Sequence, residues 1–282
     1  MRATIILLAL AGLSACDRNA SRNEEASVPA TPAALTWEGG DYKDDAAKLE
    51  HGKRLATILD CTGCHGKNLQ GQNVTADDPK YGDMNAPNIT LLLAKYSDAD
   101  FDQLIRHGQP KDGREFWFMP VESFQFLSDA DLAAIISYLR TFKPEGRQLP
   151  PIKKGKGFQE DVERGFGNAH QQVARYSAEP PEDMGPEQAW GRYLVETTCT
   201  ACHNSKLQGY QGFTPNLDLA GAYSPEELAH LLTTGEGKTK KDLGMMSEMA
   251  RNHFSLMTPS ERAAVVAYVK ARADRPQPAQ AQ

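Results

Sequence analysis

Long hydrophobic runs are missing from this sequence of 282 residues, of which 40% are hydrophobic and 24% are charged. A channel with several membrane spans needs repeated apolar stretches of about 20 residues, so this class is excluded. A basic excess is also missing, because 31 Lys and Arg residues face 37 Asp and Glu residues and the net charge is −6. Nothing in this balance favours a nucleic-acid partner. The length suits one large or two small globular domains.

The amino-terminal segment predicts export and lipid attachment. Residues 4–13 form an apolar run of about ten residues behind Arg2, too short to span a bilayer and typical of an export signal. The following Leu13-Ser14-Ala15-Cys16 resembles the bacterial lipobox, in which a peptidase cuts before a lipid-modified cysteine. We therefore expect a signal peptide over 1–15 and lipidation of Cys16, with an ordinary secretory signal and an incidental thiol as the alternative. Residues 16–44 are polar and rich in Pro and Ala, which predicts a flexible tether.

An internal repeat accounts for most of the remaining chain. The run Cys61-Thr62-Gly63-Cys64-His65 has its counterpart in Cys199-Thr200-Ala201-Cys202-His203. The match continues in the same order, with Leu69-Gln70-Gly71 against Leu207-Gln208-Gly209 and Pro87-Asn88 against Pro215-Asn216. Two copies of one domain, over 45–145 and 183–274, explain this order.

Helix signals in both copies predict an all-α fold. Ser97 and Ser224 are each followed three residues later by a carboxylate, the capping-box arrangement at the start of a helix. Gly108 and Gly235 stand where these helices would end. No segment shows the sustained alternation of polar and apolar residues that predicts strands. Two tandem helical domains are therefore expected.

The two segments outside the copies have the composition of irregular structure. Residues 146–182 contain two Pro-Pro pairs and a cluster of Lys and Gly at 153–157, which is typical of a linker on the surface. Residues 275–282, rich in Pro, Gln and Ala, are expected to form a disordered tail.

The Cys-x-x-Cys-His pattern of both copies carries the chemistry. Two thiols at this spacing lie on neighbouring turns and form thioethers with both vinyl groups of one haem, and the next histidine presents its imidazole to the iron. A zinc half-site and a redox-active dithiol are the alternatives for Cys-x-x-Cys alone. The adjacent histidine in both copies, together with the export signal, favours two covalently attached haem c groups.

Each copy resembles a class I cytochrome c domain, and the pair resembles a dihaem cytochrome c lipoprotein. This resemblance implies a small helical bundle around one covalent haem per copy, with the haem-binding residues Cys61, Cys64, His65, Cys199, Cys202 and His203. It implies His65 and His203 as proximal ligands of the iron. The carbonyls of Pro87 and Pro215 are similar to the proline carbonyl that accepts a hydrogen bond from the proximal imidazole in this family. Plain loop residues are the alternative for both prolines.

The resemblance also implies a methionine as the sixth iron ligand of the first copy. Met119-Pro120, just ahead of Phe124, matches the placement of the family's Met-Pro pair, and Met84 is the rival.

In the second copy, Met245, Met246 and Met249 all lie on the corresponding loop. Met249 lies five residues before Phe254, the same spacing that separates Met119 from Phe124, and this count back from the phenylalanine favours Met249. The run that begins Met246-Ser247-Glu248 is similar to haem-binding repeats of multihaem dehydrogenase subunits, and on this ground we select Met246. The remaining histidines are alternative ligands, although solvent-facing or capping roles are expected for most: His51, His107, His170, His230 and His253.

The resemblance to cytochrome c subunits of membrane-bound dehydrogenases implies an electron carrier with no catalytic residues of its own. The expected partners are redox proteins, namely a dehydrogenase or quinol-oxidising complex and an oxidase or other terminal acceptor. A lipid anchor would hold the chain on the periplasmic side of a bacterial membrane, and Asp17 favours the inner membrane. A dihaem peroxidase with one open haem site is the alternative function, and a haem-based gas sensor is a third class.

Overall fold

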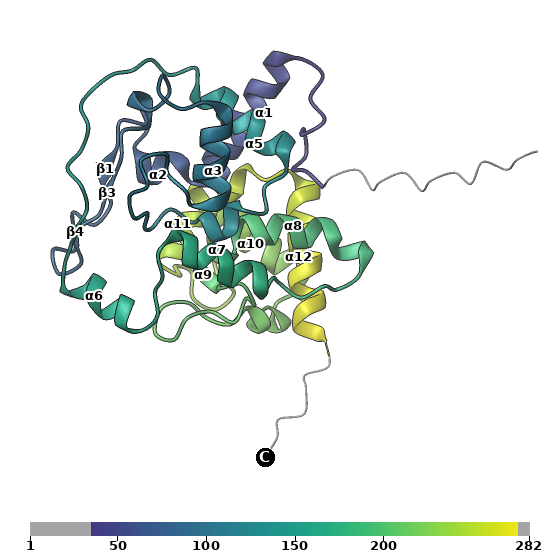
Figure 1. Cartoon of the computed structure of the whole chain (residues 1–282). Helices are drawn as coiled ribbons and strands as arrows, with labels where there is room; N and C mark the ends of the chain where they lie inside the picture. The colour runs from purple at the N-terminus through teal and green to yellow at the C-terminus, as the bar shows by residue number, and fades with distance from the viewer. Residues whose placement is uncertain (1–34, 276–282) are drawn as a thin grey trace, which may run out of the picture. The chain divides into compact units, whose positions relative to one another are not determined.

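Helices dominate residues 35–275, the part of the chain that the computed structural model describes (Figure 1). The strands in this part are two-residue segments that form two small antiparallel pairs. Within residues 35–275, none of the helices has the length and apolar character needed to cross a membrane. The predicted signal peptide, Cys16 and nearly all of the predicted tail lie outside the described residues. The prediction of a mainly helical fold is confirmed.

The first repeat consists of five α-helices, one 3₁₀ turn and three of the short strands. In chain order these are α1 (Asp45–Ile58), α2 (Cys61–His65), β1 (Gln72–Asn73), β2 (Gly82–Asp83), β3 (Asn85–Ala86), η1 (Ile89–Leu91), α3 (Asp98–His107), α4 (Val121–Phe124) and α5 (Asp129–Leu139). Strand β1 pairs with β3.

The second repeat has the same order of helices without the strands. Its elements are η2 (Pro186–Gln188), α8 (Ala189–Thr198), α9 (Thr200–His203), η3 (Leu217–Ala222), α10 (Pro225–Thr234), α11 (Met245–Asn252), η4 (Phe254–Leu256) and α12 (Pro259–Asp274). Helices α1, α2, α3 and α5 thus correspond to α8, α9, α10 and α12.

The predicted helix signals are confirmed in both repeats. Ser97 forms a complete capping box at the start of α3, and Ser224 forms one at the start of α10. The two helices end at Gly108 and Gly235, which adopt left-handed backbone conformations with φ of 63° and 77°. A side chain is strained in this conformation, so glycine is the residue that ends these helices at lowest cost.

A glycine also fixes the crossing of the first and last helices in each repeat. A β-carbon placed on Gly52 of α1 would lie 1.9 Å from the carbonyl oxygen of Ala134 in α5. A β-carbon on Gly191 of α8 would lie 2.3 Å from the carbonyl oxygen of Ala264 in α12. These separations are far below van der Waals contact, so only glycine lets the helices approach so closely. Both repeats therefore build the same helix crossing from the same sequence position.

The two repeats contact each other through equivalent buried carboxylates. Arg54 of α1 donates to Glu261 at the start of α12, with an Nη1–Oε2 distance of 2.8 Å. Tyr193 of α8, which stands at the position of Arg54 in the repeat, donates its hydroxyl to Asp131 at the start of α5 at 2.5 Å. Both carboxylates have no exposed surface. Each repeat thus supplies a donor to the carboxylate of the other, as in a two-fold symmetric interface.

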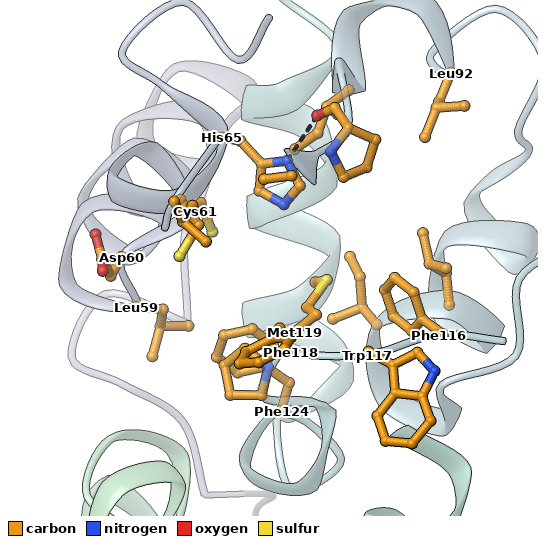
Figure 2. Close-up of a pocket in the computed structure, with 18 of the residues that line it drawn as sticks. Leu59, Asp60, Cys61, His65, Leu92, Phe116, Trp117, Phe118, Met119 and Phe124 are labelled. Atoms are coloured by element: carbon orange, nitrogen blue, oxygen red, sulfur yellow. Dashed lines mark hydrogen bonds between the residues drawn. The ribbon is translucent and has the colours of Figure 1, made fainter. Parts of the chain in front are cut away.

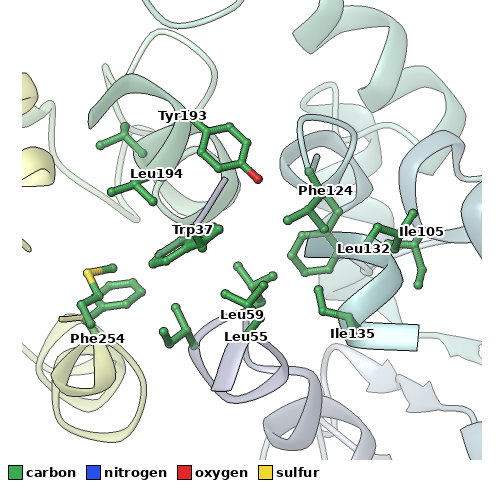
Figure 3. Packing of buried hydrophobic residues seen from close by; sticks show 14 of the residues in the cluster. Trp37, Leu55, Leu59, Ile105, Phe124, Leu132, Ile135, Tyr193, Leu194 and Phe254 are labelled. Carbon is green, nitrogen blue, oxygen red and sulfur yellow. The ribbon is translucent and has the colours of Figure 1, made fainter. Parts of the chain in front are cut away.

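Trp37 shows that the expected tether boundary at residue 44 is wrong. Its side chain is fully buried between Leu194 of the second repeat and Leu55 of α1 (Figure 3). Its backbone amide donates to Asp131 at 3.0 Å, and its indole donates to Thr197 at 3.2 Å. The tether was predicted from the mean composition of the segment, which gives little weight to a single large residue such as Trp37. Residues 35–44 therefore belong to the packed structure.

The expected surface linker over 146–182 is also more ordered than its composition indicates. It contains β4 (Lys153–Lys154), α6 (Lys156–Glu163) and α7 (Ala169–Ala178). Phe158 of α6 and Tyr176 of α7 are among the most completely buried side chains of the described chain. Strand β4 pairs with β2 of the first repeat. Prolines and glycines lie at the ends of these elements. Two aromatic side chains anchor the segment, Phe158 on the first repeat and Tyr176 beside α9.

Candidate functional site: two haem attachment sites

In the first repeat, helix α2 carries Cys61, Cys64 and His65. The ring nitrogen Nδ1 of His65 donates to the carbonyl oxygen of Pro87 at 2.8 Å. A carbonyl can only accept, so the proton resides on Nδ1 and Nε2 keeps its lone pair for a metal. Such a hydrogen bond also fixes the orientation of the imidazole and increases its donor strength.

Helix α9 presents the same arrangement in the second repeat. The Nδ1 atom of His203 donates to the carbonyl oxygen of Pro215 at 2.9 Å. The hydroxyl of Thr214 donates to the carbonyl oxygen of Cys202 at 2.5 Å, which ties the loop of Pro215 to the helix. The structure therefore brings each predicted histidine together with its predicted proline, at almost the same distance in both repeats.

A largely apolar pocket lies beside α2 and contains the predicted sixth ligand. Cys61, Cys64 and His65 line one part of its wall, and Met119 lines another (Figure 2). The rest of the wall is mainly hydrophobic: Ile89, Leu92, Phe101, Leu104, Phe116, Phe124, Leu127, Ile135 and Leu139 are among its members. Met84 lines the same pocket and is almost fully buried. The thiols, imidazole, thioether and apolar walls fit the donor set and the surroundings of a covalently attached haem.

The candidate sixth ligands of the second repeat lie on one helix, α11. Met245, at its first position, is 56% exposed. Met246 and Met249 are half-buried and pack against the hydrophobic core. Residues three apart lie on the same face of a helix. The fold therefore turns both toward the interior, and the selection of Met246 stays a prediction.

Burial favours the neutral forms of the cysteine and histidine side chains at α2 and α9, which we call the attachment helices. Burial raises the pKa of the Cys61 thiol to about 12 and that of the Cys199 thiol to about 11. Burial also lowers the pKa of the His65 and His203 imidazoles. A redox-active dithiol needs a depressed thiol pKa, which is the opposite of this pattern. Neutral imidazole is the form that binds iron.

A structural zinc site needs about four ligands in a tetrahedron. Throughout residues 35–275, no three side chains of His, Cys, Asp or Glu come together as a metal-binding group. The described residues therefore give no support to the zinc alternative for either Cys-x-x-Cys pair.

Three of the five remaining histidines have other partners. His51 is an exception to the solvent-facing or capping roles expected for most of them, because it is buried under α5 and lies 2.7 Å from Asp131. The Nδ1 atom of His253 lies 2.7 Å from the carbonyl oxygen of Thr57, and its Nε2 faces Asp60 at 3.3 Å. His230 faces Glu236 near the surface. For these three histidines, the contacts favour roles other than that of a sixth ligand.

Two contacts that the sequence did not indicate join the attachment helices to the opposite repeat. Ser123, four residues after Met119, lies with its hydroxyl 2.7 Å from that of Thr200 in the second attachment helix. His253, four residues after Met249, contacts Thr57 and Asp60 just ahead of the first attachment helix. No local pattern marks these residues, because the partners are 77 positions apart in the first case and 196 in the second.

A buried carboxyl accompanies the first of these contacts. Burial raises the pKa of Glu122, next to Ser123, to about 7. The pKa of the Cys202 thiol in the second repeat is raised mainly by burial and further by the negative charge of this carboxyl. The carboxyl is therefore partly protonated near neutral pH and adds less than a full negative charge between the two sites.

Both repeats match the same known protein family. The profile of the family described as cytochrome c matches residues 49–143 and 188–273, which together are more than half of the chain. Both matched segments contain one Cys-x-x-Cys-His helix and its proline carbonyl. The predicted family resemblance is confirmed.

Several characterised proteins are similar to the chain. A diheme cytochrome c-type protein of Cereibacter sphaeroides is 25% identical over 280 residues, covering 84% of this chain and 93% of the relative. The fructose dehydrogenase cytochrome subunit of Gluconobacter japonicus is 26% identical, covering 79% of this chain and 52% of the relative. A component of the nicotinate dehydrogenase of Pseudomonas putida is 29% identical over 64% of this chain, which spans 15% of that protein. This chain thus spans about half or less of these two dehydrogenase components.

Proposed function

The chain belongs to the cytochrome c family, and from that premise we propose that it is a dihaem electron carrier. It passes electrons between a dehydrogenase or quinol-oxidising complex and a terminal acceptor. It performs no bond-making chemistry itself. Dehydrogenase partners are supported by the similarity to cytochrome subunits of fructose, alcohol and gluconate dehydrogenases.

One observation carries this proposal, namely that the complete attachment constellation occurs twice. In each repeat two cysteines and a histidine lie within five residues at a short helix, with Cys199 as the N-cap residue of α9, and each histidine donates to a proline carbonyl, at 2.8 Å and 2.9 Å. Haem c bound at these positions supplies a one-electron Fe(III)/Fe(II) couple. The protein residues attach it and orient the proximal imidazole, and in the first repeat the apolar pocket walls exclude water.

Contacts between the repeats support transfer from one site to the other. Ser123 follows the candidate ligand Met119, and Thr200 lies between the two cysteines of the second repeat, so their hydrogen bond joins the two sites directly. The pair of Arg54 with Glu261 and that of Tyr193 with Asp131 hold the same interface. A fixed interface keeps the distance between the two sites constant, which a relay requires.

A test with hydrogen peroxide separates the carrier from an enzyme. With an excess of a chemical electron donor, we expect the protein to show no catalytic turnover of peroxide, because a methionine thioether would close the iron in each repeat. Met119→Ala, which opens the first iron, is the matched control and should react with peroxide in the first repeat. Saturable turnover of peroxide by the unmodified protein would establish the peroxidase function instead.

We propose further that Cys16 is lipidated and anchors the chain on the periplasmic side of a bacterial membrane. The support is the run Leu13-Ser14-Ala15-Cys16 behind an apolar segment. Each buried methylene of an acyl chain contributes about 0.8 kcal/mol, so two or three chains bind durably. The residue that follows, Asp17, favours the inner membrane.

Cys16→Ala should move the protein from the membrane fraction to the soluble fraction. Ser21→Ala is a matched control in the same segment and should leave the protein in the membrane fraction. Fractionation followed by haem staining measures the distribution. A Cys16→Ala protein that stays with the membrane would show that another feature holds it there.

A further inference from the structure

A segment outside the family match packs on the first site. The match leaves out residues 144–187, and within them we define residues 152–169 as the clamp. Ile152 lines the pocket beside α2. Strand β4 pairs with β2 on one side, and the amide of Ala169 donates to the carbonyl oxygen of Phe116 at 2.8 Å on the other. The clamp therefore connects the strand region to residues 116–119, which we call the methionine loop.

Phe158 is the centre of this connection. Its ring is 1% exposed and lies at centroid distances of 6.0 Å from Tyr81, 5.1 Å from Trp117 and 5.6 Å from Phe118. Phe166, also in the clamp, lies 5.3 Å from Phe118 and 6.0 Å from Trp117. These separations are typical of favourable aromatic pairs. Two rings of the clamp thus hold two consecutive rings of the methionine loop.

The backbone of the methionine loop indicates that it needs such support. Phe118, directly before Met119, has a φ of 68°, a left-handed conformation that is unfavourable for a bulky residue. A residue persists in this conformation only where its surroundings fix it. The ammonium group of Lys154 in β4 adds a contact 4.4 Å from the Trp117 ring centre.

The second repeat has no counterpart of the clamp among residues 183–275. Its candidate ligands lie on α11, which contains no aromatic residue that could pair as Trp117 and Phe118 do. The residue before α11 is Gly244, which adopts its φ of 64° without a side chain to strain. The two methionine segments are therefore held by different means.

From this difference we propose that the clamp is a positioning element that holds the methionine loop closed over the first iron, with Phe158 as its anchor. The proposal rests on the proposed ligation of a haem iron by Met119. A small external ligand binds that iron only when the loop is open, so its apparent affinity equals its intrinsic affinity multiplied by the open fraction. The first site should therefore resist external ligands more strongly than the second.

Titration of the ferric protein with imidazole tests the proposal. The optical band of methionine-ligated ferric haem should be lost in two phases, and Met119→Ala should abolish the weaker one. Phe158→Ala should strengthen imidazole binding in that phase by about tenfold, because each of the two lost ring pairs with the loop corresponds to a factor of roughly two to ten. The tighter phase should not change.

Further variants separate positioning from general destabilisation. Phe166→Ala, at a half-buried position, should act in the same direction if Phe158→Ala fails to fold. Phe158→Leu should strengthen imidazole binding in the weaker phase less than Phe158→Ala does. Val162→Ala, at an exposed position of α6, should leave imidazole binding unchanged. If Met119→Ala removes neither phase, the proposed ligation is wrong. If it removes one phase that both phenylalanine variants leave unchanged, the ligation stands and the clamp proposal is overturned.

Discussion

Cys61→Ala or Cys64→Ala should yield a chain that carries one covalent haem instead of two, and the haem that remains should be the one in the second repeat. Attachment there depends on Cys199 at the N-cap of α9 and on Cys202 and His203 within it, and His203 has its own proline carbonyl. Thr62→Ala, in the first attachment helix, is the matched control and should keep both haems. Intact mass and haem staining of the denatured protein give the number of attached groups.

The structure adds an expectation about the stability of the one-haem protein. A single cluster of buried hydrophobic residues includes Leu55 and Leu59 of the first repeat and Leu194 and Phe254 of the second. Loss of one haem therefore removes support from a shared core, so the midpoint of thermal unfolding should fall for the whole chain. Loss of both haems after either cysteine substitution would contradict independent attachment.

Met119→His should leave the first iron low-spin and lower its potential by on the order of 0.2 V, within the range of about 0.8 V that axial ligands span. Imidazole favours ferric over ferrous iron relative to the thioether of methionine. Potentiometric titration should show one potential displaced and the other changed only slightly. A potential of the first repeat that does not respond would identify another ligand, with Met84 as the next candidate.

Two alanine substitutions assign the sixth ligand of the second repeat. Met246→Ala should open the second iron to carbon monoxide, whereas Met249→Ala should cost some packing and leave the ligation intact. The two residues are matched controls for each other, since both are half-buried on one face of α11. If Met249→Ala is the variant that binds carbon monoxide, counting back from Phe254 was the better guide.

Local features were predictable from the sequence because local physics determines them. The capping boxes at Ser97 and Ser224 and the left-handed glycines at 108 and 235 follow from hydrogen bonding and sterics within one turn. The order of matched residues in the two copies indicated one fold repeated twice, and the family match agrees.

Features set by long-range packing were not predictable in the same way. Mean composition described residues 35–44 and 146–182 as irregular, yet Trp37 and Phe158 anchor these segments from within. The contact of Ser123 with Thr200 requires the mutual placement of two repeats, which no local pattern encodes. The choice between Met246 and Met249 depends on less than one helical turn, so neither periodicity nor burial decides it.

The most direct test of the central claim is a redox titration of the purified chain combined with extraction by acid-acetone. We expect two one-electron transitions per chain, with all of the haem remaining attached to the protein. A single one-electron transition, or haem that passes into the solvent, would contradict a carrier with two covalently bound haem groups.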